Sequence, residues 1–94
     1  MTINEFIEVL ELKAMNSIGR FHNVDFCIAQ QGPFNDTKGE MHETRFMAYV
    51  CGERPLKPLF CNTVDELLDL FVIENRHLRD FLSEIQTFYA SKCL

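Results

Sequence analysis

Residues 44–61, TRFMAYVCGERPLKPLFC, contain two apolar runs separated by a turn signal. In the first run, Thr44 to Cys51, Phe46, Ala48 and Val50 alternate with Arg45, Met47 and Tyr49. This two-residue period is typical of a strand that buries one face. Gly52 to Pro55 predicts a turn, and Leu56 to Cys61 predicts a short further strand. That strand is expected at a sheet edge, because Pro58 has no backbone N–H to donate.

Another strand is predicted upstream, from Arg20 to Gln30. Its pattern is again two-sided, with Val24, Phe26 and Ile28 on one face and Asn23, Asp25 and Cys27 on the other. Residues 31–43 are rich in Gly, Asn, Asp and Pro, and they predict a long loop. Hairpin links between neighbouring strands favour antiparallel pairing. We therefore expect a three-stranded antiparallel meander.

Helices are predicted before and after these strands in the sequence. Thr2 to Glu5 fits a capping box, in which Thr and Glu side chains satisfy backbone donors, and the helix is expected from Thr2 to Ser17, with Gly19 as its stop. Thr63 to Glu66 fits a second capping box. A last helix, capped by Asn75, is expected to bury a stripe of Leu78, Phe81, Leu82, Ile85, Phe88 and Tyr89. The predicted class is α+β, in the order α-β-β-β-α-α, as a single domain over residues 1–94.

The composition is that of one small globular domain. The chain has 94 residues, of which 47% are hydrophobic and 24% are charged, which is too apolar for a disordered protein. No apolar run approaches the roughly 18 residues of a membrane span. The stretch from Met1 to Phe6 is acidic and amphipathic, whereas a secretory signal begins with basic residues. We therefore expect a cytoplasmic protein that does not bind membranes.

The charge is unevenly distributed along the chain. A net charge of −5 argues against direct nucleic acid binding, which requires a positive surface. Acidic residues gather in 1–12 and 63–74, and neither segment holds a basic residue. One interpretation is that these are ordinary solvated helix faces. The other is an acidic surface that imitates nucleic acid or meets a basic partner.

Residues with catalytic or metal-binding chemistry form no recognisable motif. The cysteines are Cys27, Cys51, Cys61 and Cys93, and no C-x-x-C or H-x-x-x-H spacing accompanies them. Three of the four lie in hydrophobic segments, so we expect reduced thiols that fill the core. Cys51 and Cys61 flank a hairpin and could lie near each other, whereas His22 and Cys27 are expected on opposite strand faces. We therefore expect no enzyme, no catalytic residue, no metal and no cofactor.

Two features could bind a partner. Met47 and Tyr49 share the second face of the sheet with Cys27. Helices could cover that face; if they do not, an apolar patch there marks an interface with another protein, of which a homodimer is one form. Phe34, between Gly-Pro and Asn-Asp in the long loop, is either an aromatic anchor for a partner or a side chain folded back onto the domain.

The C-terminal half carries a resemblance to a broad group of proteins. The stretch 59–68, LFCNTVDELL, with Phe71-Val72-Ile73 and Leu78-Arg79-Asp80-Phe81, resembles small accessory proteins of Gram-positive bacteria, their phages and mobile elements. The expected element order and the acidic segment 2–8, TINEFIE, resemble phage-encoded anti-CRISPR inhibitors. In some of those inhibitors an acidic surface occupies the nucleic acid site of a nuclease. The resemblance implies a protein partner and a phage or mobile-element origin.

Three functional hypotheses follow. The first is a small non-catalytic protein-interaction module of phage or mobile-element origin. The second is an acidic inhibitor that mimics nucleic acid, whose binding would weaken steeply with salt. The third is an enzyme or metal protein, which requires a pocket with converging polar groups. We expect the first, with Phe34, Met47 and Tyr49 as the partner-binding residues.

Overall fold

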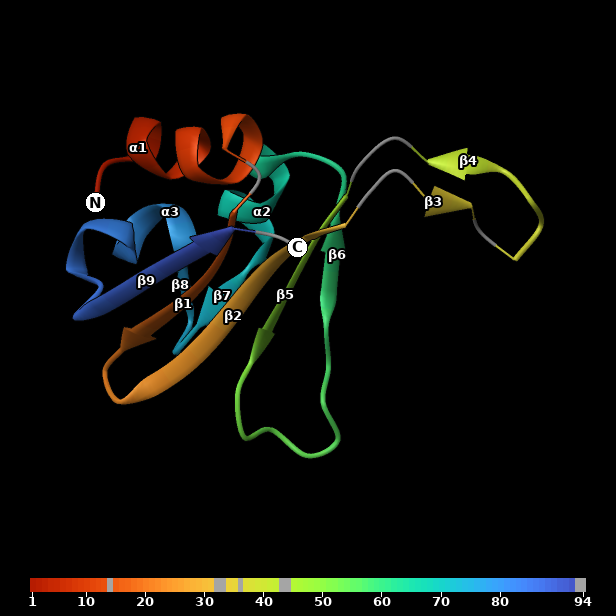
Figure 1. Cartoon of the computed structure of the whole chain (residues 1–94). Helices are drawn as coiled ribbons and strands as arrows, with labels where there is room; N and C mark the ends of the chain where they lie inside the picture. The colour runs from red at the N-terminus through yellow and green to blue at the C-terminus, as the bar shows by residue number, and fades with distance from the viewer. Residues whose placement is uncertain (14, 32–33, 36, 43–44, 93–94) are drawn as a thin grey trace.

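A five-stranded antiparallel sheet organises the computed structural model of the chain, which describes residues 1–13, 15–31, 34–35, 37–42 and 45–92. The strand order is β6-β5-β2-β1-β9 (Figure 1). From one edge to the other, the strands are β6 (Leu59–Cys61), β5 (Arg45–Val50), β2 (Val24–Gln31), β1 (Met15–Phe21) and β9 (Thr87–Lys92). The α+β class is therefore confirmed, but the three-stranded meander in the order α-β-β-β-α-α is wrong. Strands β2, β5 and β6 correspond to the expected meander, with β6 at the edge as predicted, and β1 and β9 extend the sheet.

The β1–β2 hairpin replaces the end of the predicted first helix and the start of the predicted first strand. His22 and Asn23 connect the two strands with positive φ angles of 49° and 64°. This is the conformation of a two-residue turn whose twist matches the flanking strands, and Asn adopts it readily. The helix expected to reach Ser17 ends earlier, as α1 (Ile3–Ile7) followed by a π-helical segment, η1 (Glu8–Leu12).

Gly19 lies within β1, and the prediction that it stops a helix is wrong. It pairs with Phe26 on β2, whose ring lies against it. A Cβ atom at position 19 would come within 2.4 Å of the ring atom Cζ of Phe26. A larger residue would therefore displace a ring that lies in the centre of the core.

Two helices begin where the capping boxes predict. The Thr2 hydroxyl accepts a hydrogen bond from the backbone N–H of Glu5 at 3.2 Å, at the start of α1. Thr63 does the same for Glu66 at 3.1 Å, at the start of α2 (Val64–Leu70). These bonds satisfy backbone donors that a helix start leaves free. The caps at Thr2 and Thr63 are confirmed, but the predicted Asn75 cap is wrong, because the helix at Leu78–Phe81 has His77 as its N-cap and no side-chain capping hydrogen bond.

The C-terminal segment is more broken than the single last helix predicted. After α2, a short hairpin of β7 (Val72–Ile73) and β8 (Arg76–His77) turns at Glu74 and Asn75, whose φ angles are 52° and 64°. It leads into a one-turn helix, α3 (Leu78–Phe81), a 3-10 turn, η2 (Leu82–Glu84), and then β9. Leu78, Phe81 and Leu82 of the predicted helical stripe are buried as expected. Residues 87–92, however, form a strand that pairs with β1. Tyr89, predicted on the buried stripe, is 64% exposed.

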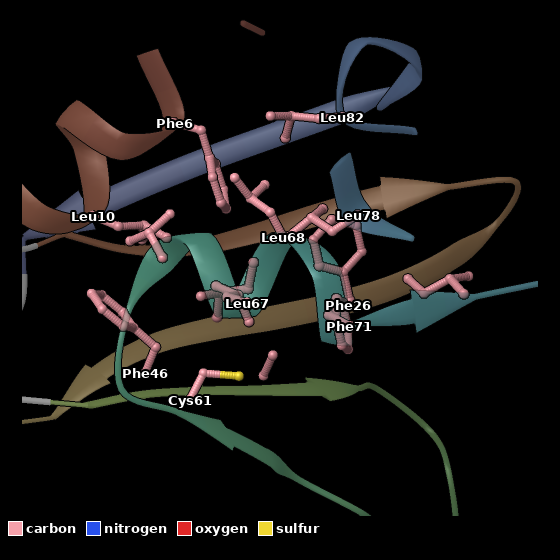
Figure 2. Packing of buried hydrophobic residues seen from close by; sticks show 14 of the residues in the cluster. Phe6, Leu10, Phe26, Phe46, Cys61, Leu67, Leu68, Phe71, Leu78 and Leu82 are labelled. Carbon is pink, nitrogen blue, oxygen red and sulfur yellow. The ribbon is translucent and has the colours of Figure 1, made fainter. Parts of the chain in front are cut away.

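The helices lie on one face of the sheet and enclose the core. Figure 2 shows side chains of α1, η1 and α2 packed against those of the strands. The buried cluster comprises Phe6, Leu10, Phe21, Phe26, Ile28, Phe46, Ala48, Cys61, Val64, Leu67, Leu68, Phe71, Ile73, Leu78, Phe81 and Leu82. Stacking of Phe21 on Phe81, with ring centroids 4.4 Å apart, joins β1 to α3. The predicted inner face is confirmed, because Phe26, Ile28, Phe46 and Ala48 belong to this cluster and Val24 and Val50 are partly buried against it.

The predicted long loop carries a small hairpin. Strands β3 (Phe34–Asn35) and β4 (Met41–His42) form a separate two-stranded sheet, which projects away from the five-stranded sheet (Figure 1). No helix in the described part of the chain is long and apolar enough to cross a membrane.

Candidate functional site: the outer sheet face

The outer face is the side of the five-stranded sheet that points away from the helices. Side chains alternate along each strand, so the neighbours of the core residues point to this side. All the buried residues of α1, η1, α2 and α3 pack in the cluster on the opposite side, and none covers the outer face. Its central residues are Ile18, Arg20, Asp25, Cys27, Ala29, Arg45, Met47, Tyr49, Phe60 and Tyr89.

An apolar row, which we call the central row, crosses four strands of the outer face. Tyr49 pairs with Cys27, Cys27 pairs with Ile18, and Ile18 pairs with Tyr89. Ile18 is 51% exposed and Tyr89 is 64% exposed. Cys27 and Tyr49 are half-buried. Directly opposed residues on adjacent strands are close enough for their side chains to touch, so the row is a continuous surface.

A second apolar row runs beside the central row. Phe60 pairs with Met47, and Met47 pairs with Ala29. Phe60 is 46% exposed, and the Arg45 guanidinium lies over its ring, 4.3 Å from the centroid. A hollow of about 250 Å³ opens on the sheet, lined in part by Ile18, Cys27, Ala29 and Tyr49. The outer face is thus an apolar surface with a shallow depression.

The charged groups of the outer face interact within it. Arg20 donates two hydrogen bonds to the Asp25 carboxylate, at 2.7 and 3.2 Å. This pair lies on neighbouring strands, two residues further along each strand than Ile18 and Cys27 of the central row. The hydrogen bond from Arg20 lowers the pKa of Asp25, so the carboxylate stays ionised at neutral pH. The Arg20–Asp25 pair therefore lies at the margin of the central row and does not interrupt it.

The cysteines are arranged differently from the prediction. Cys61 is buried in the core as expected, but Cys27 and Cys51 lie outside the core cluster and Cys51 is exposed. The two thiols that lie close together are those of Cys27 and Cys51, whose Sγ atoms are 3.3 Å apart. The sequence had suggested Cys51 and Cys61 as neighbours, but Cys61 is buried in the core. A hydrogen bond with Cys27 raises the pKa of the Tyr49 phenol. Burial and the Cys27 neighbour raise the pKa of Cys51 to about 11. Cys93 lies outside the described residues.

The predicted partner-binding residues fall in two places. Met47 and Tyr49 are on the outer face, side by side with residues that the sequence interpretation missed. Phe34 is on β3, in the separate hairpin, and its backbone pairs with that of His42. Ile18 was missed because it lies between the predicted first helix and the predicted first strand, and Tyr89 was missed because it was assigned to the last helix. Residues 15–21, MNSIGRF, do not alternate between apolar and polar, so no local strand pattern pointed to Ile18.

The acidic segment 63–74 makes contacts within the protein. Asp65 and Asp69 both bind the Arg79 guanidinium, at 2.7 and 2.9 Å. The Glu66 carboxylate accepts a hydrogen bond from the backbone N–H of Asn62. Two further acids are paired elsewhere: Glu84 with Arg76, and Glu8 with Lys13 at 3.3 Å. Asp65, Asp69, Glu84 and Glu8 therefore each lie within ion-pair distance of an arginine or lysine, with Asp65 and Asp69 sharing one.

Outside the outer face, polar side chains line a hollow of about 240 Å³ formed by Glu11, Gln30, Phe46 and Asn62, and a second polar contact lies at His22. His22 contacts Glu74 through Nδ1 and Oε2 at 2.8 Å and stacks on Phe21. Within the described ranges, no three His, Cys, Asp or Glu residues gather to hold a metal ion. No family model, curated protein or solved structure matches the chain. The candidate site is therefore identified from the geometry of the outer face.

Proposed function

We propose that this protein is a small non-catalytic interaction module that binds another protein through the outer face of its sheet. The observation that carries the proposal is the central row, Tyr49-Cys27-Ile18-Tyr89, on a face that no described helix covers. Contiguous exposed apolar surface on a small protein marks an interaction site. Tyrosine is enriched in such sites because its ring is large and rigid, and its hydroxyl tolerates water.

The partner surface is expected to be apolar and nearly uncharged. Arg20 and Asp25 already satisfy each other at the margin, and Arg45 stacks on Phe60. A partner that placed a charge over the central row would leave it desolvated without an opposite charge, at a cost of several kcal/mol. Aromatic or aliphatic side chains of the partner fit the shallow hollow beside Ile18 and Tyr49.

The alternative, an acidic inhibitor that mimics nucleic acid, receives less support. A mimic needs carboxylates that are available to a basic partner, but Asp65 and Asp69 share one arginine. Glu66 is part of a helix cap, and Glu74 contacts His22. The described contacts of the 63–74 segment thus favour solvated, internally balanced helix faces over an inhibitory surface.

The test is capture of partners from lysate of the native host, compared across matched variants. Tyr89→Ala removes an aromatic ring from the central row, and Leu70→Ala removes an aliphatic side chain of similar exposure, 55%, from α2. Because both residues are exposed, neither substitution should unfold the protein. The proposal predicts a partner that is lost with Tyr89→Ala and retained with Leu70→Ala.

Charge reversal separates the two hypotheses. In the interaction module, changing Glu5 and Glu11 to Lys leaves capture nearly unchanged, since exposed charges are each worth about 1 kcal/mol or less. In a nucleic acid mimic, the same change abolishes capture and Tyr89→Ala is tolerated. A captured partner with that second pattern would overturn the proposal. Sedimentation velocity over a concentration series identifies the case in which the partner is a second copy of the chain.

A further inference from the structure

The thiols of Cys27 and Cys51 lie next to each other on the outer face. Cys27 is on β2, and Cys51 directly follows β5, where its backbone N–H donates to the Asp25 carbonyl at 2.8 Å. Cys51 therefore lies diagonally across from Cys27, and their Sγ atoms are 3.3 Å apart. A disulfide bond is about 2.05 Å long, so a small approach of the two sulfurs would join them.

We propose that Cys27 and Cys51 are a reversible dithiol–disulfide couple whose substrates are low-molecular-weight disulfides such as oxidised glutathione. One thiolate of the pair attacks a sulfur of the small disulfide, breaks its S–S bond and releases one thiolate. The second cysteine loses its proton and attacks the mixed disulfide, which releases the other small thiol. The protein pair is oxidised by two electrons, and the small disulfide is reduced to two thiols.

Exposure distinguishes these two cysteines from Cys61. Cys51 is exposed and Cys27 is half-buried, so a small disulfide can reach the pair from solvent. Cys61 is 3% exposed and faces the core, where an oxidant cannot approach it. Because the link would lie at the surface, an excess of small thiol can attack it and restore both thiols. The inference concerns the pair itself and does not depend on the proposed binding function.

The sequence allows the pair to be identified without substitutions. Cleavage after glutamates places each cysteine in its own peptide: Cys27 in 12–40, Cys51 in 44–53, Cys61 in 54–66 and Cys93 in 85–94. Dilute native protein is incubated with excess oxidised glutathione, the remaining thiols are blocked, and the linked peptides are identified by mass spectrometry. We expect the 12–40 and 44–53 peptides to be joined, and reduced glutathione to separate them.

Two variants complete the experiment. Cys51→Ser should lose the link and carry glutathione on Cys27 instead, whereas Cys93→Ser should form the link as the parent does. A parent protein that keeps glutathione on Cys27 or Cys51 without forming the internal link would overturn the proposal. So would a dominant link between other peptides, or between two chains, under these dilute native conditions.

Discussion

At the scale of single residues, Ser17 places a hydroxyl inside the core. Ser17 is 2% exposed on β1, and its Oγ has no hydrogen-bond partner among the described residues. A buried polar group without a partner costs about 1–3 kcal/mol. We therefore expect Ser17→Ala to leave the free energy of unfolding unchanged or to raise it by about 1 kcal/mol. Urea denaturation measures this, and a loss of more than about 1 kcal/mol would show that the hydroxyl is satisfied.

Cys51 should make the reduced protein sensitive to alkali. Burial raises the pKa of its thiol from 9.0 to about 11. Between these values the unfolded chain releases its proton first, so the folded state binds more protons and the free energy of unfolding falls as pH rises. Denaturation of reduced protein at several pH values should give a smaller alkaline decrease in Cys51→Ser than in the parent. Equal decreases would mean that the Cys51 pKa is not raised by folding.

At the scale of the elements, the start of α2 depends on one side chain. The Thr63 hydroxyl accepts the Glu66 N–H at 3.1 Å. Removing such a cap costs about 1 kcal/mol, so Thr63→Ala should lower the free energy of unfolding by that amount. Thr37→Ala, at an exposed threonine outside the helices, is the matched control and should change little. An unchanged denaturant midpoint in Thr63→Ala would show that the cap contributes nothing.

The turn after α3 offers a second pair of matched variants. Leu82 is 1% exposed and packs in the core, so Leu82→Ala should cost about 2–5 kcal/mol, enough to unfold a marginal domain. Glu84 is exposed and pairs with Arg76, and such surface pairs are worth about 0–1 kcal/mol. Thermal or urea denaturation should therefore separate the two variants clearly. Equal effects would contradict the packing of this segment.

Local patterns predicted the elements that depend on local chemistry. The alternation in β2 and β5 identified which residues face the core, and the capping boxes located two helix starts. The β1–β2 turn was missed because His22 and Asn23 include no glycine, the usual signal of a two-residue turn. Strand β9 was missed because its pairing with β1 joins residues about 70 positions apart, such as Gly19 and Phe88. Such non-local pairing leaves no local signal, and the helical period ahead of it was extended too far.

At the scale of the whole molecule, the same two errors hid half of the candidate site. Met47 and Tyr49 could be placed on a second sheet face from β5 alone. Ile18 and Tyr89 complete the central row, but Ile18 lies between the predicted first helix and first strand, and Tyr89 was assigned to the predicted last helix. The sequence also could not show which acidic side chains form ion pairs in the fold. The sequence displays Asp65 and Asp69 as free charge, whereas the fold brings Arg79 to both.

Titration of the captured partner against matched variants tests the outer face most directly. Truncating an aromatic side chain at the centre of an interface costs about 2 kcal/mol or more, which is on the order of a 30-fold loss of affinity. We predict such a loss for Tyr89→Ala and for Tyr49→Ala at both low and high salt, and an unchanged affinity for Leu70→Ala. Intact binding in both tyrosine variants, with parent affinity that falls steeply as salt increases, would contradict the account.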